Sequence, residues 1–263
     1  MNLIGIRYLH LKRNYKMICA LMIGRAGSKG FPKKNIKKVL GRRICEYPLI
    51  ACKNSKYVNK IFVSTDCPII TKVSKKYGAI HIKRPKKLAS NKALGEDVYE
   101  HGYFEIKKIL NLDVKKIEFI ILLMANAPTI TGKLIDKGIN ILRRNKNFDS
   151  AVTTSIYNMW SPLRARKINN RNLLKPFVPF ETFGDPKTLN CDRDSQGDVY
   201  FADMSVSIVR PRCLEKLKEG LLPQKWMGQK IAPIQQEAGC DVDYEWQIPV
   251  VEWWLSKYWD VKI

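Results

Sequence analysis

The sequence predicts an α/β protein with a mostly parallel sheet and helices on both of its faces. Apolar, β-branched runs alternate with helical patterns from residue 17 to residue 157, and strands that alternate with helices favour parallel pairing. The run at 117–124 is the most hydrophobic segment, so we place it at the centre of the sheet, where both faces are covered. The 263 residues, 45% of them hydrophobic, are enough to bury such a core.

The first part of the chain supplies most of the strands and helices. Pro68 suits the first turn of a helix and Gly78 suits its end, because the first turn needs no amide donor and glycine adopts the left-handed conformation of helix ends. We expect strands at 17–24, 59–66, 79–85, 117–124 and 149–157, with helices at 42–55, 68–78, 95–110 and 131–145.

The pattern loosens in the second part of the chain. Residues 161–197 are rich in Pro, Asn and Arg, which predicts an arm or lid that leaves the core, with a strand-turn-strand at 167–176. A strand is expected again at 198–210, and residues 239–259 predict a turn that leads into an amphipathic helix.

We expect one domain at 17–263, preceded by an extension at 1–16. The apolar stretch of that extension is short, and its basic residues follow it, which is the reverse of the order in a signal peptide. No segment approaches the length that spans a bilayer. The seven cysteines are scattered and never form C-x-x-C, which favours free thiols, a reducing cytoplasm and no zinc site.

The formal net charge of +23 invites a nucleic-acid or membrane partner. The lysines, however, are spread from Lys12 to Lys262 without one dense tract or an aromatic platform among them. We therefore expect a solvated lysine-rich surface with local sites for an acidic small molecule, and no nucleic acid and no membrane as partners.

A glycine- and lysine-rich loop follows the first strand. It reads "RAGSKGFPKKN" from Arg25 to Asn35, and glycine lets a backbone approach a ligand while arginine and lysine suit phosphate. The spacing fits neither the P-loop nor the dinucleotide fingerprint. The loop, Asp66 and the "ANAP" turn after Met124 all follow strands, so we expect them to meet at one edge of the sheet.

The loop matches in full the pattern R-x-G-S-K-G-x-x-x-K-N, the signature of the CMP-N-acylneuraminate synthetases (acylneuraminate cytidylyltransferases). The segments "VSTD" (63–66), "KYGA" (76–79), "RPKKLAS" (84–90) and "DVD" (241–243) resemble later blocks of that family in the same order. The resemblance covers nearly the whole chain. It implies a Rossmann-like nucleotide-diphospho-sugar transferase fold with a dimerisation arm, and a nucleotidyltransferase of the EC 2.7.7 class that transfers CMP from CTP to an acidic 2-keto sugar, releasing pyrophosphate.

The chemistry gives roles to the matched residues. Arginine, lysine and backbone N–H groups neutralise the charge of a triphosphate and of the leaving pyrophosphate. We expect Arg25, Lys29, Lys34 and Asp243 to be catalytic, and the nucleotide to bind Arg25, Gly27, Ser28, Lys29, Lys34, Asn35, Arg84 and Ser90. The alternative for the loop is a basic turn on the surface. The alternative for Arg84 is a solvated charge, and the alternative for Asp66 is a structural role.

Asp241 and Asp243 lie on the same side of an extended stretch. Two carboxylates in that arrangement suit Mg²⁺, and the resemblance implies that they form the metal site of the family. Without the resemblance, we would interpret the D-x-D pattern as a solvated turn. No residue stands out as a separate general base, and a metal that lowers the pKa of the attacking hydroxyl would remove the need for one.

The chain departs from the family at "LLMANAPT" (122–129), where the family carries L-L-Q-P-T-S-P-L. Met124 replaces a ligand-contacting glutamine, and Asn126 and Ala127 replace a Thr-Ser pair. We expect Met124 and Asn126 to face the sugar, and the sugar to be a relative of N-acetylneuraminate with different substituents. The alternative is that Met124 lies behind the pocket and does not contact the sugar.

Other functions stay open at this point. The same fold could use another NTP or a neutral sugar phosphate, or the chain could be a catalytically silent nucleotide-binding protein. The arm carries apolar residues that need burial, and the resemblance implies a homodimer in which each arm crosses to the partner. These residues are Leu173, Leu174, Phe177, Phe180 and Phe183.

Overall fold

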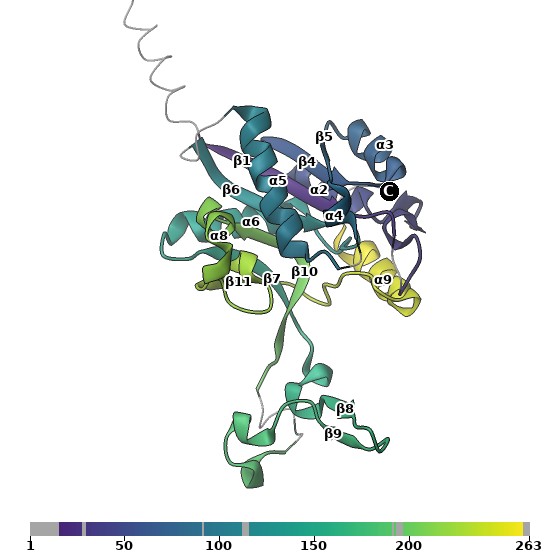
Figure 1. The fold of residues 1–263 in the computed structure, drawn as a ribbon, viewed down its shortest axis with the longest axis vertical. Coiled ribbons are helices and arrows are strands. Elements are labelled where there is room, and N and C mark those ends of the chain that lie inside the picture. The colour runs from purple at the N-terminus through teal and green to yellow at the C-terminus, as the bar shows by residue number, and fades with distance from the viewer. Residues whose placement is uncertain are drawn as a thin grey trace, which may run out of the picture.

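The computed structural model describes residues 16–27, 30–90, 92–111, 116–190, 192 and 197–259 (Figure 1). Residues 1–15 of the predicted extension and two predicted site residues, Ser28 and Lys29, lie outside these ranges. The main sheet has seven strands: β1 (Met17–Gly24), β4 (Lys60–Thr65), β5 (Ile80–Lys83), β6 (Ile117–Met124), β7 (Ser150–Ile156), β10 (Tyr200–Val209) and β11 (Ile231–Gln235).

The strands of this sheet are arranged in the order β11-β7-β10-β6-β1-β4-β5. β1 pairs in parallel with β4 and β6, β4 with β5, and β7 with β11, whereas β10 is antiparallel to β6 and β7. β7 and β10 are antiparallel because the chain leaves along one and returns along the other, as in a long hairpin. The predictions of a mostly parallel sheet and of a central strand at 117–124 are confirmed.

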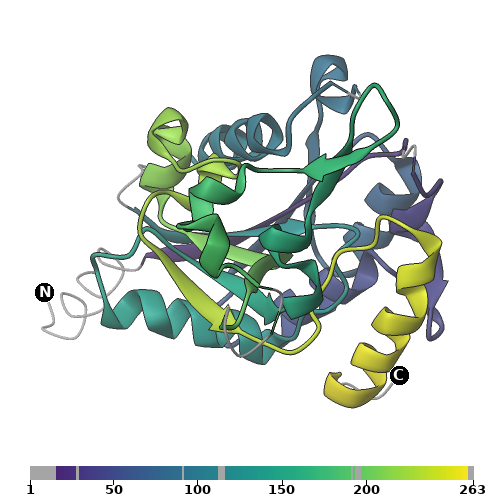
Figure 2. The same ribbon diagram turned by 90° about the horizontal axis from the view of Figure 1, so that it is seen from below.

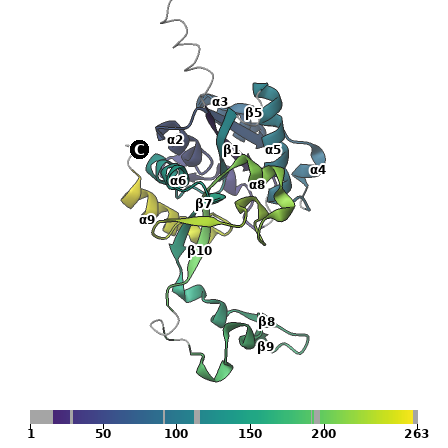
Figure 3. The same cartoon turned by 90° about the vertical axis from the view of Figure 1, so that its left-hand side faces the viewer.

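Helices cover both faces of the sheet (Figure 3). α2 (Glu46–Asn54), α3 (Pro68–Lys76) and α6 (Gly132–Arg144) pack on one face, and α5 (Gly95–Leu110) and α8 (Pro211–Glu215) pack on the other. The short helix α4 (Lys86–Ala89) lies in the connection between β5 and α5.

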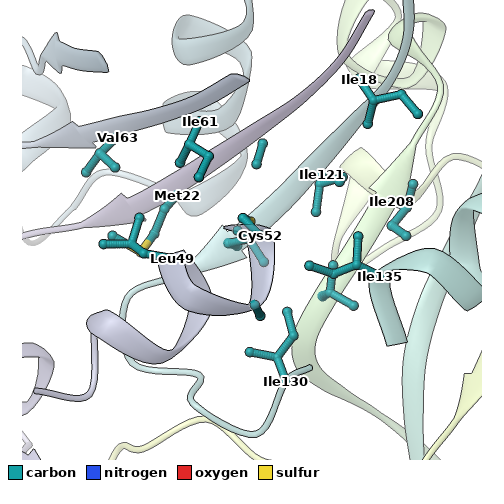
Figure 4. Close-up of a cluster of buried hydrophobic side chains, with 14 of the residues drawn as sticks. Ile18, Met22, Leu49, Cys52, Ile61, Val63, Ile121, Ile130, Ile135 and Ile208 are labelled. Atoms are coloured by element: carbon teal, nitrogen blue, oxygen red, sulfur yellow. The ribbon is translucent and has the colours of Figure 1, made fainter. Parts of the chain in front are cut away.

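β1 shows how the sequence divides the core. Successive side chains of a strand point to opposite faces, and β1 is apolar on both. Ile18, Ala20 and Met22 join the cluster with α2, α3 and α6 (Figure 4), whereas Cys19, Leu21 and Ile23 join the cluster with α5. Apart from Ile23, which is 9% exposed, each of these is at most 1% exposed, so the strand is held from both sides.

A third cluster joins the signature loop to the C-terminal helix α9 (Ile248–Tyr258). Trp254 of α9 is 1% exposed and packs with Phe31 and Tyr47. In Figure 2, α9 lies beside the early segment of the chain that follows β1. Trp254 therefore contributes to packing, whereas Trp246 is 59% exposed.

The structure contains elements that the sequence pattern did not predict. The helix expected from residue 42 begins at Glu46, because Arg42–Arg43 form strand β3, which pairs with β2 (Lys38–Val39). β11 was missed because it is only five residues long and contains Pro233, which is tolerated at the edge of a sheet. The five-residue helix α8 was missed as well.

The excursion expected at 161–197 is an arm that projects from the body between β7 and β10 (Figures 1 and 3). Its described residues include the antiparallel hairpin of β8 (Arg166–Ile168) and β9 (Leu174–Pro176), which confirms the strand-turn-strand at 167–176. Leu174 and Phe177 are 68% and 61% exposed, so the arm leaves apolar side chains uncovered in a single chain.

The six cysteines among the described residues are all free thiols, as the scattered spacing predicts. Cys191 lies outside the described part of the chain. Within that part, no helix combines the length and the apolar composition that a membrane crossing needs.

Candidate active site

Three segments that follow parallel strands meet at one edge of the sheet. The backbone N–H of Ala26, after β1, donates to the Asp66 carboxylate after β4 at 2.9 Å. The N–H of Ala125, after β6, donates to the carbonyl of Ile23 at 2.9 Å. Gly24 makes this approach possible, because a Cβ there would lie 2.6 Å from the Cβ of Ala125. The convergence expected from the strand order is confirmed.

A cavity of about 220 Å³ opens at this edge. Most of the predicted site residues in the described part of the chain line it: Arg25, Gly27, Lys34, Asn35, Arg84, Ser90, Met124 and Asn126. Its remaining wall is mainly apolar and comes from β1, the α4 segment and the start of α5, with Ile23, Gly24, Leu88, Ala93, Leu94, Gly95 and Val98.

Asn35 ties the two ends of the signature loop together. It lies in a short 3-10 helix (Lys34–Ile36), is 7% exposed, and donates from Nδ2 to the carbonyl of Arg25 at 3.0 Å. Its Oδ1 is buried and has no hydrogen-bond partner among the described residues. A buried acceptor without a partner costs free energy, so this oxygen can accept a donor from a bound molecule.

Arg84 is fixed by the end of β4. Its guanidinium donates from Nε to the Ser64 hydroxyl at 3.3 Å and from Nη2 to the Ser64 carbonyl. Arg84 is only 8% exposed, which excludes the solvated charge that was the alternative. Burial lowers the pKa of its guanidinium, and the charge of Asp66 opposes that shift. The cavity therefore has a buried cation held in one orientation.

Ser90 contributes its backbone more than its hydroxyl to this site. Nη1 of Arg25 donates to the Ser90 carbonyl at 3.0 Å, whereas the Ser90 hydroxyl donates to the carbonyl of Lys87 at 3.0 Å. The contact joins the signature loop to the segment between α4 and α5, so Arg25 and Ser90 close the cavity from two sides.

Asn126 holds the segment that carries the two aspartates. Its Nδ2 donates to Asp241 Oδ2 and to the carbonyl of Val242, both at 3.1 Å, and its carbonyl accepts the N–H of Val242 at 2.8 Å. The amide expected to face the sugar thus lines the cavity and also orients Asp241.

Asp243 lies where the two sides of the site meet. Its carboxylate forms an ion pair with Nζ of Lys34, in which the side chains are 53% and 15% exposed respectively. Its backbone N–H donates to Gln247 Oε1 at 2.6 Å. A partly exposed pair contributes little net free energy, so Lys34 can exchange this carboxylate for a phosphate without a large cost.

Burial raises the pKa of Asp241, and the neighbouring charge of Asp243 raises it further, while Lys34 opposes both. This donor set fits a cation, because a bound cation would relieve the repulsion between the two carboxylates. No cluster of three or more acidic, His or Cys side chains suited to a metal exists in the described part of the chain. Two carboxylates are nevertheless enough for Mg²⁺, which usually completes its shell with substrate phosphates and water.

Met124 and Ala127, two of the residues that depart from the family pattern, differ in their position relative to the cavity. Met124 lines the cavity. Ala127 is fully buried and does not line the cavity, so its lost hydroxyl bears on packing and not on the ligand. Asp66 accepts the Ala26 N–H, which is the structural role weighed for it.

Sequence reasoning missed the apolar wall residues Leu88, Ala93, Leu94 and Val98. Leu88 lies within the "RPKKLAS" block, Ala93 and Leu94 lie between this block and α5, and Val98 lies in the first turn of α5. Their nearness in sequence to Arg84 and Ser90 was the available signal. Their direction toward the cavity depends on how α5 packs on the sheet.

A protein-family model described as Cytidylyltransferase matches residues 19–245. This range contains the whole signature loop, the cavity wall and both aspartates of the 241–243 segment. The chain belongs to the cytidylyltransferase family.

Several curated proteins are similar to this family member. A pseudaminic acid cytidylyltransferase and UDP-2,4-diacetamido-2,4,6-trideoxy-beta-L-altropyranose hydrolase of Helicobacter pylori is 28% identical over 57% of the chain and 28% of its own length. Post-translational flagellin modification protein B of Campylobacter coli is 33% identical over 52% of the chain and 55% of its own length. The match therefore spans about half or less of these two relatives. A CMP-N,N'-diacetyllegionaminic acid synthase of Legionella pneumophila is 26% identical over 84% of the chain and 98% of its own length.

Solved structures share the fold of this cytidylyltransferase family member. A CMP:2-keto-3-deoxy-manno-octonic acid synthetase complexed with CTP superposes with a TM-score of 0.63 at 14% identity, over 92% of the chain and 99% of its own length. A 4-diphosphocytidyl-2C-methyl-D-erythritol synthase from Anaerococcus prevotii gives a TM-score of 0.56 at 17% identity, over 92% and 96% of the two chains. At these identities the likeness concerns the fold.

We expect Asp243→Asn to lower the pKa of Asp241. The substitution removes a neighbouring negative charge and leaves Lys34 free to act on Asp241, and both changes favour the ionised carboxylate. The measurement is a pH titration of the Asp241 carboxyl carbon by NMR. Glu245→Gln is the control, because Glu245 is exposed and paired with Lys37. An unchanged pKa in Asp243→Asn would mean that burial alone causes the shift.

Proposed function

We propose that this protein is a cytidylyltransferase that transfers CMP from CTP to a hydroxyl of an acidic, sialic-acid-like nonulosonic acid and releases pyrophosphate. One observation carries the proposal: Arg25, Gly27, Lys34 and Asn35 of the signature line one cavity, with the Asp241–Asp243 segment attached to its wall through Asn126 and Lys34. Family membership supports the reaction class, and the names of the Helicobacter and Legionella relatives support this class of sugar.

The charges of the cavity suit a nucleoside triphosphate. Arg25, Lys34 and Arg84 bring three cations to its lining, and a triphosphate carries several negative charges. Nucleotidyl transfer depends mainly on positioning and electrostatic stabilisation. Ser28 and Lys29 of the same loop are proposed nucleotide ligands as well, and Asn35 Oδ1 is an acceptor available to the ligand.

In the proposed reaction, an oxygen of the sugar attacks the α-phosphorus of CTP. A bond forms between that oxygen and phosphorus, the bond to the oxygen that bridges to the β-phosphate breaks, and pyrophosphate leaves with the bonding electrons. The proton of the hydroxyl passes to solvent. Arg25, Lys29 and Lys34 stabilise the charge that develops on the leaving group.

Asp241 and Asp243 would hold a Mg²⁺ ion, whose contribution when bound is to stabilise charge on the α-phosphate and to lower the pKa of the attacking hydroxyl. Before CTP binds, Lys34 keeps Asp243 paired. When the nucleotide arrives, Lys34 moves its hydrogen bond to a phosphate oxygen, and the Asp243 carboxylate becomes available as a ligand. Asn126 holds Asp241 in place during this exchange.

Met124 points to the kind of sugar. A thioether offers polarisable, apolar contact and no strong hydrogen bond, so a substrate hydroxyl placed against it would be left unsatisfied. A deoxy position or an acyl-amino methyl group fits this wall better. We therefore propose an acid of the pseudaminic or legionaminic type in preference to N-acetylneuraminate.

The apolar side chains of the arm support a homodimer. Ile168, Leu174 and Phe177 are between 61% and 68% exposed, and a second copy of the chain would cover them. An arm that crosses to the partner could also close the partner's sugar pocket.

Turnover should require a divalent cation and both aspartates. Asp243→Asn keeps the shape of the side chain and removes its charge, so kcat should fall by orders of magnitude while circular dichroism stays unchanged. Addition of EDTA should stop pyrophosphate release, and Mg²⁺ should restore it. Near-wild-type rates in both Asp241→Asn and Asp243→Asn would contradict the metal assignment.

Arg25→Ala and Lys34→Ala should each weaken CTP binding or turnover roughly tenfold to hundredfold, because each loses a charge-assisted contact of about 1.5–3 kcal/mol. Lys38→Ala is the matched control, since Lys38 is exposed in β2 outside the signature. Titration calorimetry and steady-state kinetics measure the effect. Equal losses in all three variants would indicate general electrostatic attraction in place of specific contacts.

The substrates are tested by pyrophosphate release from each NTP against a panel of 2-keto sugar acids. We expect the highest kcat/KM for CTP with pseudaminic- or legionaminic-type acids, and lower values for N-acetylneuraminate and for a shorter 3-deoxy acid. A preference for N-acetylneuraminate would overturn the role given to Met124. A preference for another NTP would overturn the choice of nucleotide, and activity with no pair would overturn the proposed reaction.

Light scattering should give twice the chain mass in solution. Leu174→Asp should shift the protein toward the monomer, because a charge placed in an apolar interface loses its hydration. Lys175→Asp, at the neighbouring exposed position of the same strand, is the control. A fully active wild-type monomer would refute the dimer.

A further inference from the structure

We propose that Asp203 is a positioning residue for the active site: it holds, through a buried hydrogen-bond network, the loop that carries Asp241 and Asp243. Asp203 touches neither the cavity lining nor the two aspartates. It acts on the residues directly before them, at Gly239 and Cys240. The inference rests on the proposed role of Asp241 and Asp243 in binding a metal ion.

Asp203 is a buried carboxylate with several donors around it. It is 5% exposed. Its Oδ2 accepts the Ser155 hydroxyl at 2.8 Å and Nε2 of Gln236 at 2.9 Å, and its Oδ1 accepts the N–H of Ser205 at 3.1 Å. Among the described residues no ion pair involves Asp203. Its charge is therefore satisfied by hydrogen bonds alone, each of which is stronger than a bond between neutral groups.

One branch of the network reaches the loop through Ser155. The Ser155 hydroxyl, which donates to Asp203, also accepts the backbone N–H of Gly239 at 2.8 Å. The carbonyl of Gly239 accepts the Tyr157 hydroxyl at 2.8 Å. Both polar groups of the Gly239 backbone are thus bound by the end of β7, two residues before Asp241.

A second branch reaches the loop through Thr129. Nε2 of Gln236 donates to the Ser205 hydroxyl at 3.0 Å, and the Ser205 and Thr129 hydroxyls are 2.8 Å apart. The Thr129 hydroxyl accepts the N–H of Cys240 at 2.8 Å and donates to the Cys240 carbonyl at 3.0 Å. The Thr129 hydroxyl has a single proton and donates it to the Cys240 carbonyl. Ser205 is therefore the donor in the hydrogen bond between the Ser205 and Thr129 hydroxyls.

Asp203 packs so closely against the loop that position 239 has no room for a side chain. A Cβ at Gly239 would lie 2.7 Å from Asp203 Cγ, closer than such atoms approach. On either side of this contact, Met204 and Ala238 have positive φ angles of 63° and 48°, which are costly for residues other than glycine. The network holds both segments in these conformations, and the position of the aspartates depends on them.

The test measures metal affinity directly. Free Mn²⁺ is followed by electron paramagnetic resonance at a fixed CTP concentration and without sugar, so no turnover is needed, and the same titration of CTP without protein is subtracted. In Asp203→Asn, an NH₂ group replaces one carboxylate oxygen and cannot accept the hydrogen bonds that this oxygen accepts now. The loop should therefore lose its position. We expect Mn²⁺ to bind about tenfold to hundredfold more weakly, as when residues that orient metal ligands are replaced, with CTP affinity in EDTA unchanged.

Asp149→Asn is the matched control. Asp149 also has a carboxylate that anchors backbone, since it accepts the N–H groups of Gln229 and Lys230 at 3.0 Å and 2.9 Å and pairs with Arg212. It precedes β7 at the end of the strand opposite to Ser155. We expect Asp149→Asn to lower the free energy of unfolding without changing the Mn²⁺ affinity.

Two further variants separate the possible failures. Thr129→Val removes the hydroxyl that binds the Cys240 backbone, so it cuts the second branch and should weaken Mn²⁺ binding. Ser155→Ala cuts the first branch without changing the carboxylate and should weaken Mn²⁺ binding by itself. If Asp203→Asn does not fold, Ser155→Ala and Thr129→Val decide the question.

The proposal is overturned if Asp203→Asn and Ser155→Ala bind Mn²⁺ as the wild type does, or if Asp149→Asn weakens binding equally. Asp243→Asn in the same assay tests the underlying metal site. If Asp243→Asn leaves Mn²⁺ binding intact, the metal role in the proposed function is wrong. If Asp243→Asn weakens binding and the Asp203 and Ser155 variants do not, only the positioning role is wrong.

Discussion

The site depends on the parallel pairing of β1 with β4 and β6. Parallel strands end at the same edge, and here Gly24 is in register with Thr65, and Ile23 with Met124. The register brings Asp66 to the signature loop, where it accepts the Ala26 N–H, and brings the 125–128 turn to the end of β1, where Ala125 donates to Ile23. Helices on both faces hold β1 in that register, because a shift by one residue would exchange its two apolar faces.

Charge is divided across this edge. Arg25 and Arg84 belong to the segments that follow β1 and β5, whereas Asp241 and Asp243 belong to the loop after β11. The pair between Lys34 and Asp243 joins the two sides when no ligand is bound. In the proposed reaction a triphosphate would compete for the cation of this pair, which would link nucleotide binding to release of the Asp243 carboxylate.

The local patterns predicted much of the fold. The strands at 17–24 and 117–124 and the helix at 95–110 have the predicted bounds, because long apolar runs and sustained helical periodicity outweigh other local signals. β11 escaped prediction because the edge of a sheet demands little of its residues. β10 was expected as a strand, but its antiparallel direction follows from the course of the arm, which strand propensity does not contain.

The sequence by itself determined which side chains could form the site, because the signature loop and the 241–243 segment are contiguous patterns whose chemistry is legible residue by residue. Only the tertiary structure decided how these segments are held. Asn126 proved to orient Asp241, and Asp203 proved to be bound to Ser155 and Gln236. Such contacts join residues far apart in the chain, and their partners are chosen by the packing of the sheet and loops, for which no local spacing provides a signal.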